Sequence, residues 1–258
     1  MTLSIGQIKY NLFQINETDD DMHLNVDAYL YIGEERAVLI DALQETEELY
    51  DAVRRITDRP LELLITHGHP DHAGKAVKRF AEEGIRMWMS EKDFSLYQDF
   101  LDDPLPVECF SELQDGQIFD LGGIQLETIM LEGHTPGSAV FLDRKHQYLF
   151  AGDAVGSGHF WMQIPGCLPL HNLKTAIENL LEKTEGMDQL AVYPGHRWQS
   201  PVQLNRQYIK DTLKLTEMIM DDPKTGKEQE MVMNGKKIRF CESSYGMMLG
   251  YCYNPENL

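Results

Sequence analysis

The chain has 258 residues, of which 42% are hydrophobic and 25% charged, a composition typical of a globular α/β domain with a sizeable core. The formal net charge of −19 and the lack of a basic cluster argue against nucleic acid as a partner, because phosphates are neutralised by clustered Lys and Arg. No apolar run approaches the roughly 20 residues that span a bilayer, and residues 1–7 lack the pattern of a secretory signal, so we expect a cytoplasmic protein without a membrane partner.

Strands and helices alternate in the first half of the predicted structure. β-branched and aromatic residues predict strands at 8–15, 28–32, 37–40, 61–65 and 85–89. Apolar residues at helical spacing predict helices at 46–56 and 73–83, the second ending at Gly84. Further strands are predicted at 118–121, 124–131, 139–142 and 147–150, with a tight turn at Gly122-Gly123.

Strands and helices also alternate in the second half of the chain. Helices are predicted at 173–181 and 202–220, a strand at 190–193 with Tyr193 in the core, a hairpin at 231–238 around Asn234-Gly235, and a last apolar run at 245–253. Strands that lead into short loops, with helices outside, predict a four-layer α/β/β/α sandwich. We expect one domain over residues 1–258, with a C-terminal helix and β-hairpin extension from about residue 200 packed on it. Reactive residues should then lie on loops at strand ends.

One such loop concentrates metal-binding side chains between a predicted strand and a predicted helix. Its sequence is His67-Gly68-His69-Pro70-Asp71-His72. Three imidazoles and a carboxylate within six residues are too many for one tetrahedral ion but can serve two adjacent ions if the loop turns. Glycine and proline at the intervening positions favour such a turn.

Three later positions supply the same kinds of ligand next to glycine. They are His134, Asp153 and His196. With the four above they give five imidazoles, two carboxylates and no thiolate, a set that suits zinc, iron or manganese. The four cysteines show no CxxC spacing, so we expect reduced thiols, with Cys167 the nearest to a site.

In the order and context of these motifs, the chain resembles the metallo-β-lactamase superfamily over about residues 8–200. The resemblance implies a metal-binding set for each of two divalent ions, zinc being expected and iron or manganese the alternatives. The first set is His67, His69 and His134. The second set is Asp71, His72 and His196, with Asp153 bridging the two ions. Asp41 matches an aspartate that orients a metal ligand in the family.

The implied chemistry is hydrolysis. A water shared between two cations loses a proton near neutral pH and becomes a nucleophile. Asp153 is the implied catalytic bridge, and Asp71 could also accept a proton. These two carboxylates are the expected catalytic residues.

Differences from the known branches of the superfamily narrow the range of expected substrates. True β-lactamases of this fold carry Cys or Ser where Asp153 stands, so that activity is disfavoured. Lactonases that cleave homoserine lactones carry Tyr at the position of Gly156, and glyoxalase II follows the bridging Asp with a Gly-Arg element that is absent here. Ribonuclease Z-like nucleases add a basic arm, also absent, and flavodiiron proteins carry Glu where His69 stands.

The leading hypothesis is therefore a glyoxalase-II-like hydrolase of a small-molecule ester, thioester or lactone. A phosphodiesterase acting on a small nucleotide or phospholipid-like substrate is the first alternative, and a mononuclear-iron oxidoreductase the second. The loop at 156–171 is the expected pocket wall, with His159, Trp161 and His171 as candidate substrate contacts. His23 and His146 are expected to be exposed. The oligomeric state is left open.

Overall fold

The computed structural model of the protein describes residues 2–19, 24–233 and 236–254. Its first sheet has the order β1-β2-β3-β4-β5-β6-β7. The strands are β1 (Thr2–Lys9), β2 (Leu12–Asp19), β3 (Leu24–Ile32), β4 (Ala37–Ile40), β5 (Leu61–Leu64), β6 (Arg86–Met89) and β7 (Phe110–Glu112). Pairing is antiparallel from β1 to β4 and parallel from β4 to β7. The carboxyl ends of β4 and β5 therefore meet at one edge of this sheet.

The second sheet has the order β14-β13-β11-β10-β9-β8. Its strands are β8 (Ile118–Asp120), β9 (Gln125–Met130), β10 (Ala139–Asp143), β11 (Tyr148–Gly152), β13 (Ala191–Pro194) and β14 (Leu204–Asn205). The parallel pair of β11 and β13 aligns Gly152 with Pro194. The segments that follow these two residues consequently leave the sheet side by side.

A third sheet joins the middle of the chain to its C-terminal part. Its order is β12-β17-β16-β15, from β12 (His159–Met162), β15 (Lys227–Met233), β16 (Lys236–Tyr245) and β17 (Met248–Tyr253). His159 is aligned with Gly250 in a parallel pair. The strand that follows the Asp153 loop is thus held by residues almost a hundred positions later.

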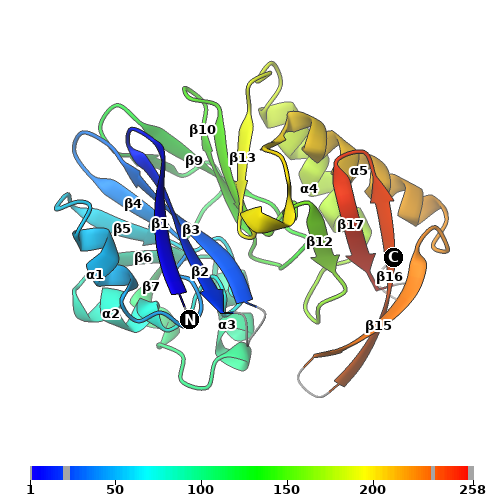
Figure 1. Cartoon of the computed structure of the whole chain (residues 1–258), viewed down its shortest axis with the longest axis horizontal. Coiled ribbons are helices and arrows are strands. Elements are labelled where there is room, and N and C mark those ends of the chain that lie inside the picture. Colours follow the sequence, from blue (N-terminus) through cyan, green and yellow to red (C-terminus); the bar gives the residue numbers. More distant parts are fainter. Residues whose placement is uncertain (1, 20–23, 234–235, 255–258) are drawn as a thin grey trace.

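Helices cover the outer faces of the stacked sheets (Figure 1). They are α1 (Leu49–Arg54), α2 (Ala76–Glu82), α3 (Phe94–Phe100), α4 (Leu170–Lys183) and α5 (Arg206–Asp221), with 3-10 turns at Glu91–Asp93, Val107–Cys109 and Arg197–Gln199. One buried cluster lies between the first sheet and α1 to α3, and another packs the second and third sheets on α4 and α5. A third lies between the first and second sheets, where Tyr193 is 2% exposed. The predicted α/β/β/α sandwich and the core position of Tyr193 are confirmed.

Several predicted boundaries were wrong. The strand predicted at 8–15 is a hairpin that turns at Tyr10, which is 94% exposed. The helix predicted from residue 73 begins only at Ala76, since the amides of Gly74 and Lys75 donate to backbone carbonyls of residues 43 and 44. The helix predicted from residue 202 begins at Arg206, because Asn205 pairs with β13 and its side chain caps the helix.

Other short elements lacked a local signal. The sequence did not predict α3, β7 or β12, whose lengths of three to seven residues are too short for a clear period.

The predicted turn at Gly122-Gly123 joins β8 and β9, with positive φ at both glycines. Asn234-Gly235, and His23, lie outside the described residues, although β15 and β16 pair antiparallel as far as Met233 and Lys236. In the part of the chain that the structure describes, no helix is long and apolar enough to cross a membrane.

Candidate metal centre

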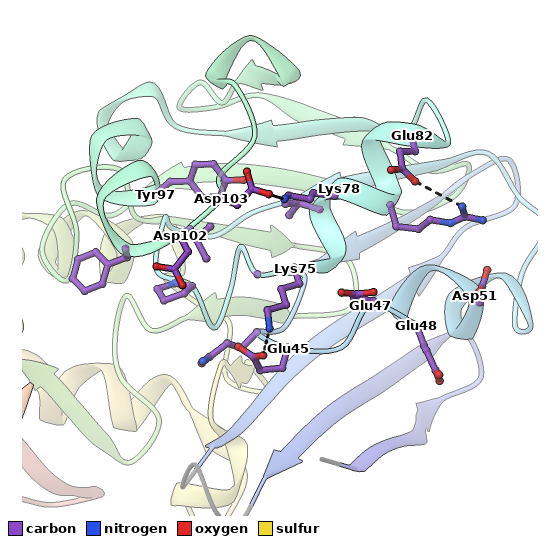
Figure 2. A pocket seen from close by; sticks show the side chains of 17 residues that line it. Glu45, Glu47, Glu48, Asp51, Lys75, Lys78, Glu82, Tyr97, Asp102 and Asp103 are labelled. Carbon is purple, nitrogen blue, oxygen red and sulfur yellow. Dashed lines mark hydrogen bonds and ion pairs between the residues drawn. The ribbon is translucent and has the colours of Figure 1, made fainter. Parts of the chain in front are cut away.

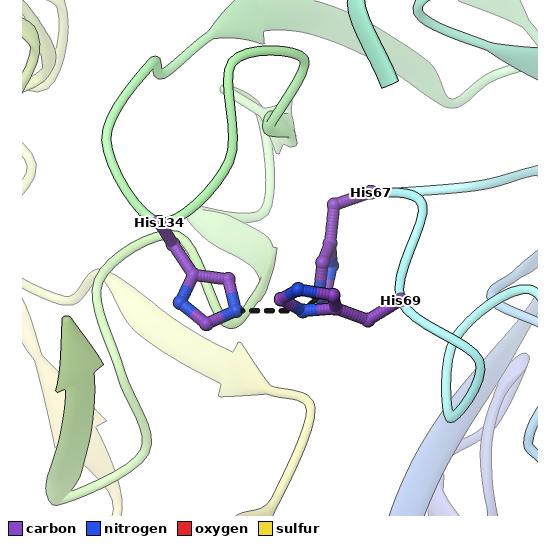
Figure 3. A group of neighbouring side chains, drawn as sticks. All are labelled: His67, His69 and His134. Carbon is purple, nitrogen blue, oxygen red and sulfur yellow. Dashed lines mark hydrogen bonds between the residues drawn. The ribbon is translucent and has the colours of Figure 1, made fainter. Parts of the chain in front are cut away.

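Three histidines from two loops meet at one point (Figure 3). His67 and His69 follow β5, and His134 lies between β9 and β10. Nδ1 of His69 is 3.0 Å from Nε2 of His67 and 3.1 Å from Nε2 of His134. All three side chains are buried, with 1%, 6% and 1% of their surface exposed in chain order. Three converging nitrogens at this spacing are a zinc-type donor set, and we call them the three-histidine group.

A second group of donors lies beside the first. It comprises Asp71, His72, Asp153 and His196, whose ligand atoms lie within 4.8 Å of one another. Nε2 of His196 is 3.3 Å from Oδ2 of Asp71 and 3.2 Å from Oδ2 of Asp153. Nε2 of His72 is 3.7 Å from Oδ2 of Asp71 and 3.6 Å from Oδ1 of Asp153. We call these four residues the carboxylate group.

Asp153 lies between the two groups. Its Oδ2 atom is 3.2 Å from Nε2 of His196 and 3.9 Å from Nε2 of His134 in the other group. Its Oδ1 atom and Nε2 of His72 are buried without a hydrogen-bond partner among the described residues. A buried polar atom without a partner costs about 1–3 kcal/mol, and a cation in this space would satisfy both atoms. The residues present therefore fit a metal site with Asp153 in the shared position.

Contacts to the Nδ1 atoms orient three of the imidazoles. Nδ1 of His72 is 2.8 Å from Oδ2 of Asp41, Nδ1 of His134 is 3.0 Å from the Trp161 carbonyl, and Nδ1 of His196 is 2.8 Å from the Asn25 carbonyl. In each ring Nε2 is left to face the site. Such outer contacts fix the tautomer and direction of a metal-binding imidazole.

Asp41 holds its place through two further bonds. Its Oδ1 atom accepts from the Thr66 amide at 2.7 Å and its Oδ2 atom from the Thr66 hydroxyl at 2.9 Å. Its backbone is in the left-handed region, with φ of 68°, an uncommon conformation for a residue other than glycine. The structure thus brings the Asp41 carboxylate into contact with Nδ1 of His72, and its role in orienting a metal ligand stays a prediction.

Replacing Asp41 by alanine is expected to weaken metal binding by about 10–100-fold, the usual effect of losing an outer partner of a metal ligand. The loss follows because His72 Nδ1 and the Thr66 amide would both lose their acceptor. A chelator-competition titration measures this effect, with Asp120→Ala on an exposed turn as the control. Unchanged affinity in a folded Asp41→Ala protein would contradict the assignment.

In the metal-free protein, the histidines of the three-histidine group are neutral and those of the carboxylate group are protonated. Burial, reinforced by the neighbouring histidines, holds the pKa of His67 well below its ordinary value and lowers that of His69 to about 3. Burial also lowers the pKa of His134. For His72 burial acts against the charged form, but the carboxylates of Asp71, Asp41 and Asp153 together raise the pKa to about 9. The pKa of His196 is likewise raised, because Asp153 and Asp71 outweigh burial.

The three candidate substrate contacts differ in burial and in the elements that carry them. His159 and Trp161 lie on β12 and are half-buried, and the Trp161 carbonyl contacts His134. His171 lies in the first turn of α4 and is exposed. β12 therefore adjoins the site, and His171 does not face it from a buried position.

Cysteine chemistry does not compete with this site. Cys109, Cys167, Cys241 and Cys252 form no disulfide. Cys167 lies 3.5 Å from the same Trp161 carbonyl, near the site as predicted. Burial raises the pKa of its thiol to about 12, so it is not a thiolate nucleophile at neutral pH.

A surface pocket of about 900 Å³ opens next to the loop of His67 to His72, and Pro70 is one of the residues that line it. Figure 2 shows the acidic and basic side chains of this pocket. It lies among α1, α2 and α3 and has seven acidic and three basic lining side chains. The ammonium groups of Lys75 and Lys78 pair with Glu45 and Asp103, and Arg79 pairs with Glu83 at 2.7 Å. Because each cation already has a carboxylate partner, this pocket is poorly suited to a phosphate-bearing ligand.

Two buried carboxylates near the site were missed by the sequence analysis. Asp27 on β3 accepts from the Arg197 amide, and its own amide donates to the Gly195 carbonyl, so it holds the loop of His196. An aspartate within an apolar strand was a usable signal, but the strand was predicted only from residue 28. Asp93 contacts the loops of the three-histidine group, and its polar surroundings in the sequence gave no such signal.

Known proteins are similar to this chain in sequence. A family model described as the metallo-beta-lactamase superfamily matches residues 22–196. The chain is 33% identical over 141 residues to the hydroxyacylglutathione hydrolase GloC of Haemophilus influenzae, covering 50% of this chain and 66%, just under two thirds, of that protein. It is 26% identical over 222 residues to the acyl-coenzyme A thioesterase MBLAC2 of Gallus gallus, covering 72% of this chain and 77% of that protein.

A solved structure shares the fold. A metallo-beta-lactamase from Pontibacter korlensis superposes with a TM-score of 0.66 at 21% identity, covering 84% of this chain and 99% of that one. At this level of identity the likeness concerns the arrangement of sheets and helices alone.

Proposed function

The chain belongs to the metallo-β-lactamase superfamily and is a metallo-hydrolase of that family, and from this premise we propose that it hydrolyses a small-molecule thioester at a dinuclear metal site. The main support for the proposal is the position of Asp153, whose Oδ2 atom lies between Nε2 of His134 and Nε2 of His196 and whose Oδ1 atom faces Nε2 of His72. A carboxylate shared between two donor groups is well suited to two adjacent ions.

The choice of a thioester draws on the relatives. Hydroxyacylglutathione hydrolase and acyl-coenzyme A thioesterase are both names of thioester hydrolases. Esters and lactones present the same acyl carbon and remain within the proposed class. Zinc is the proposed metal, since nitrogen and carboxylate donors without thiolates suit it, as they also suit iron and manganese.

The proposed mechanism assigns a task to each part of the site. His67, His69 and His134 would hold one ion, and Asp71, His72 and His196 the other, with Asp153 shared. When bound, two divalent ions supply Lewis acidity to the thioester carbonyl and lower the pKa of a water molecule. We propose Asp71 as a proton acceptor as well, since this carboxylate is only partly buried and its Oδ2 atom lies 3.3 Å from Nε2 of His196.

A substrate panel tests the proposal. Protein with its metal content measured would be assayed against lactoylglutathione, short and medium acyl-coenzyme A esters, aryl thioesters, homoserine lactones and bis(p-nitrophenyl) phosphate. We expect thioester turnover that disappears on chelation and returns with zinc. Strong phosphodiester turnover without acyl turnover would contradict the proposed class, and one redox-active iron per chain would favour an oxidoreductase.

A further inference from the structure

Asp93 bonds to both loops that carry the three-histidine group. It lies in the 3-10 turn before α3 and is fully buried. Its Oδ2 atom accepts from the Gly68 amide at 2.9 Å and from the Thr135 hydroxyl at 2.7 Å. Its Oδ1 atom accepts from the Gly137 amide at 2.6 Å. One carboxylate therefore joins the loop of His67 and His69 to the loop of His134.

The packing around Asp93 depends on glycine. A Cβ atom at Gly68 would lie 2.8 Å from the Asp93 carbonyl oxygen, and one at Gly137 would lie 2.7 Å from the Asp93 carboxyl carbon. Both distances are too short for any other residue without a shift of the loops. Gly68 stands between His67 and His69, and Gly137 lies three residues after His134, so the contact is made within the ligand loops themselves.

Building on the proposed metal function, we propose that Asp93 is a positioning residue that sets His134 against His67 and His69 and so determines the affinity of the three-histidine group for its ion. Asp93 touches no ligand atom of that group. It acts by fixing the distance between two loops that come from different sheets, β5 in the first and β9–β10 in the second.

A carboxylate is the appropriate side chain for this task. Its Oδ2 atom accepts from both loops and its Oδ1 atom from the loop of His134, whereas an asparagine in its place offers only one acceptor oxygen. In the Asp93→Asn variant, the side-chain amide nitrogen would face either the Gly137 amide or the Gly68 amide, donor against donor. One of the two loops would then lose the hydrogen bond from its backbone amide, while the size of the side chain stays the same.

The carboxylate group has other anchors. His72 is held by Asp41, and His196 by the Asn25 carbonyl. The Arg197 amide next to His196 is held by Asp27. Removing the Asp93 contacts should therefore leave this group in place, and the effect of the variant should be selective for one of the two groups.

The test measures zinc affinity in two backgrounds that isolate the groups. His196→Ala leaves the three-histidine group intact, and His134→Ala leaves the carboxylate group. Adding Asp93→Asn should weaken zinc binding by about 10–100-fold in the first background and leave it unchanged in the second. Thr135→Val, which removes one of the three bonds to Asp93, should show a smaller loss in the first background.

Asp143→Asn is the matched control. Asp143 is also fully buried and accepts from Tyr31 and from the His146 amide, but it lies at the other end of β10. It should leave zinc affinity unchanged in both backgrounds.

The outcomes separate this proposal from the proposed function. An equal loss of zinc affinity in both backgrounds, or no loss in either, would overturn the role of Asp93. The unfolding temperature of the metal-free proteins shows whether a loss of affinity comes from failed folding. If the unmodified protein binds no zinc at either group, the dinuclear proposal itself fails. Selective loss with an unchanged unfolding temperature supports the positioning role.

Discussion

Replacing Asp153 by alanine is expected to reduce the bound metal toward one ion per chain and to lower turnover by orders of magnitude. The carboxylate contacts both groups, with His134 at 3.9 Å and His196 at 3.2 Å from one oxygen. Its removal takes one donor from each side and leaves His72 and His196 without a carboxylate that now neutralises them. Metal analysis of dialysed protein, together with kcat/KM for the best thioester of the panel, measures both effects.

The control for this variant keeps the fold and removes a distant charge. Asp120→Ala at the exposed Gly122 turn should retain full metal content and full turnover. Two tightly bound ions per chain in Asp153→Ala would contradict the shared position of this carboxylate. The metal content and turnover of Asp153→Asn, which retains one acceptor oxygen, should fall between those of the alanine variant and those of the unmodified protein.

The two donor groups could be predicted from the sequence because every member is a chemically distinctive residue near a strand end. The motif at His67 to His72 follows a buried strand, and His134, Asp153 and His196 each adjoin a glycine. Parallel pairing of β4 with β5 and of β11 with β13 brings such ends together. The fold class followed from the same alternation of strands and helices.

Apart from Asp41, which the resemblance to the family identified, the supporting contacts could not be predicted, since each depends on a partner far away in the sequence. Asp93 is 42 residues from Thr135, and 25 from Gly68. The pairing of β12 with β17 likewise depends on residues near the end of the chain. Local patterns carry no information about which polar residue will face which loop.

His146 was predicted to be exposed, and the structure confirms this, although its Nδ1 atom lies 2.7 Å from Oδ2 of Asp143. Tyr31 of β3 donates to the same carboxylate at 2.8 Å. This bond joins the first sheet to the second, and no local pattern in the sequence predicts it.

The protonation states of the two groups predict opposite responses of metal binding to pH. His72 has a pKa of about 9 in the metal-free protein, and the pKa of His196 is also raised, so both are protonated at pH 7. Each must lose its proton before Nε2 can bind an ion, and apparent affinity then rises about tenfold per pH unit for each proton released. The three-histidine group has lowered pKa values and is already neutral there.

Between pH 6 and pH 8 we therefore expect zinc affinity to rise by about 10²–10⁴-fold at the carboxylate group and to stay nearly constant at the three-histidine group. The His134→Ala and His196→Ala proteins isolate the two groups for chelator-competition titrations at each pH. Calorimetry in two buffers of different ionisation enthalpy counts the protons released, about two for the carboxylate group and none for the other. Equal pH slopes for both groups would contradict the assigned charges. Unequal slopes would mean that acidification strips the carboxylate group first, because its histidines are held as cations by Asp71 and Asp153, the carboxylates that would bind the metal with them.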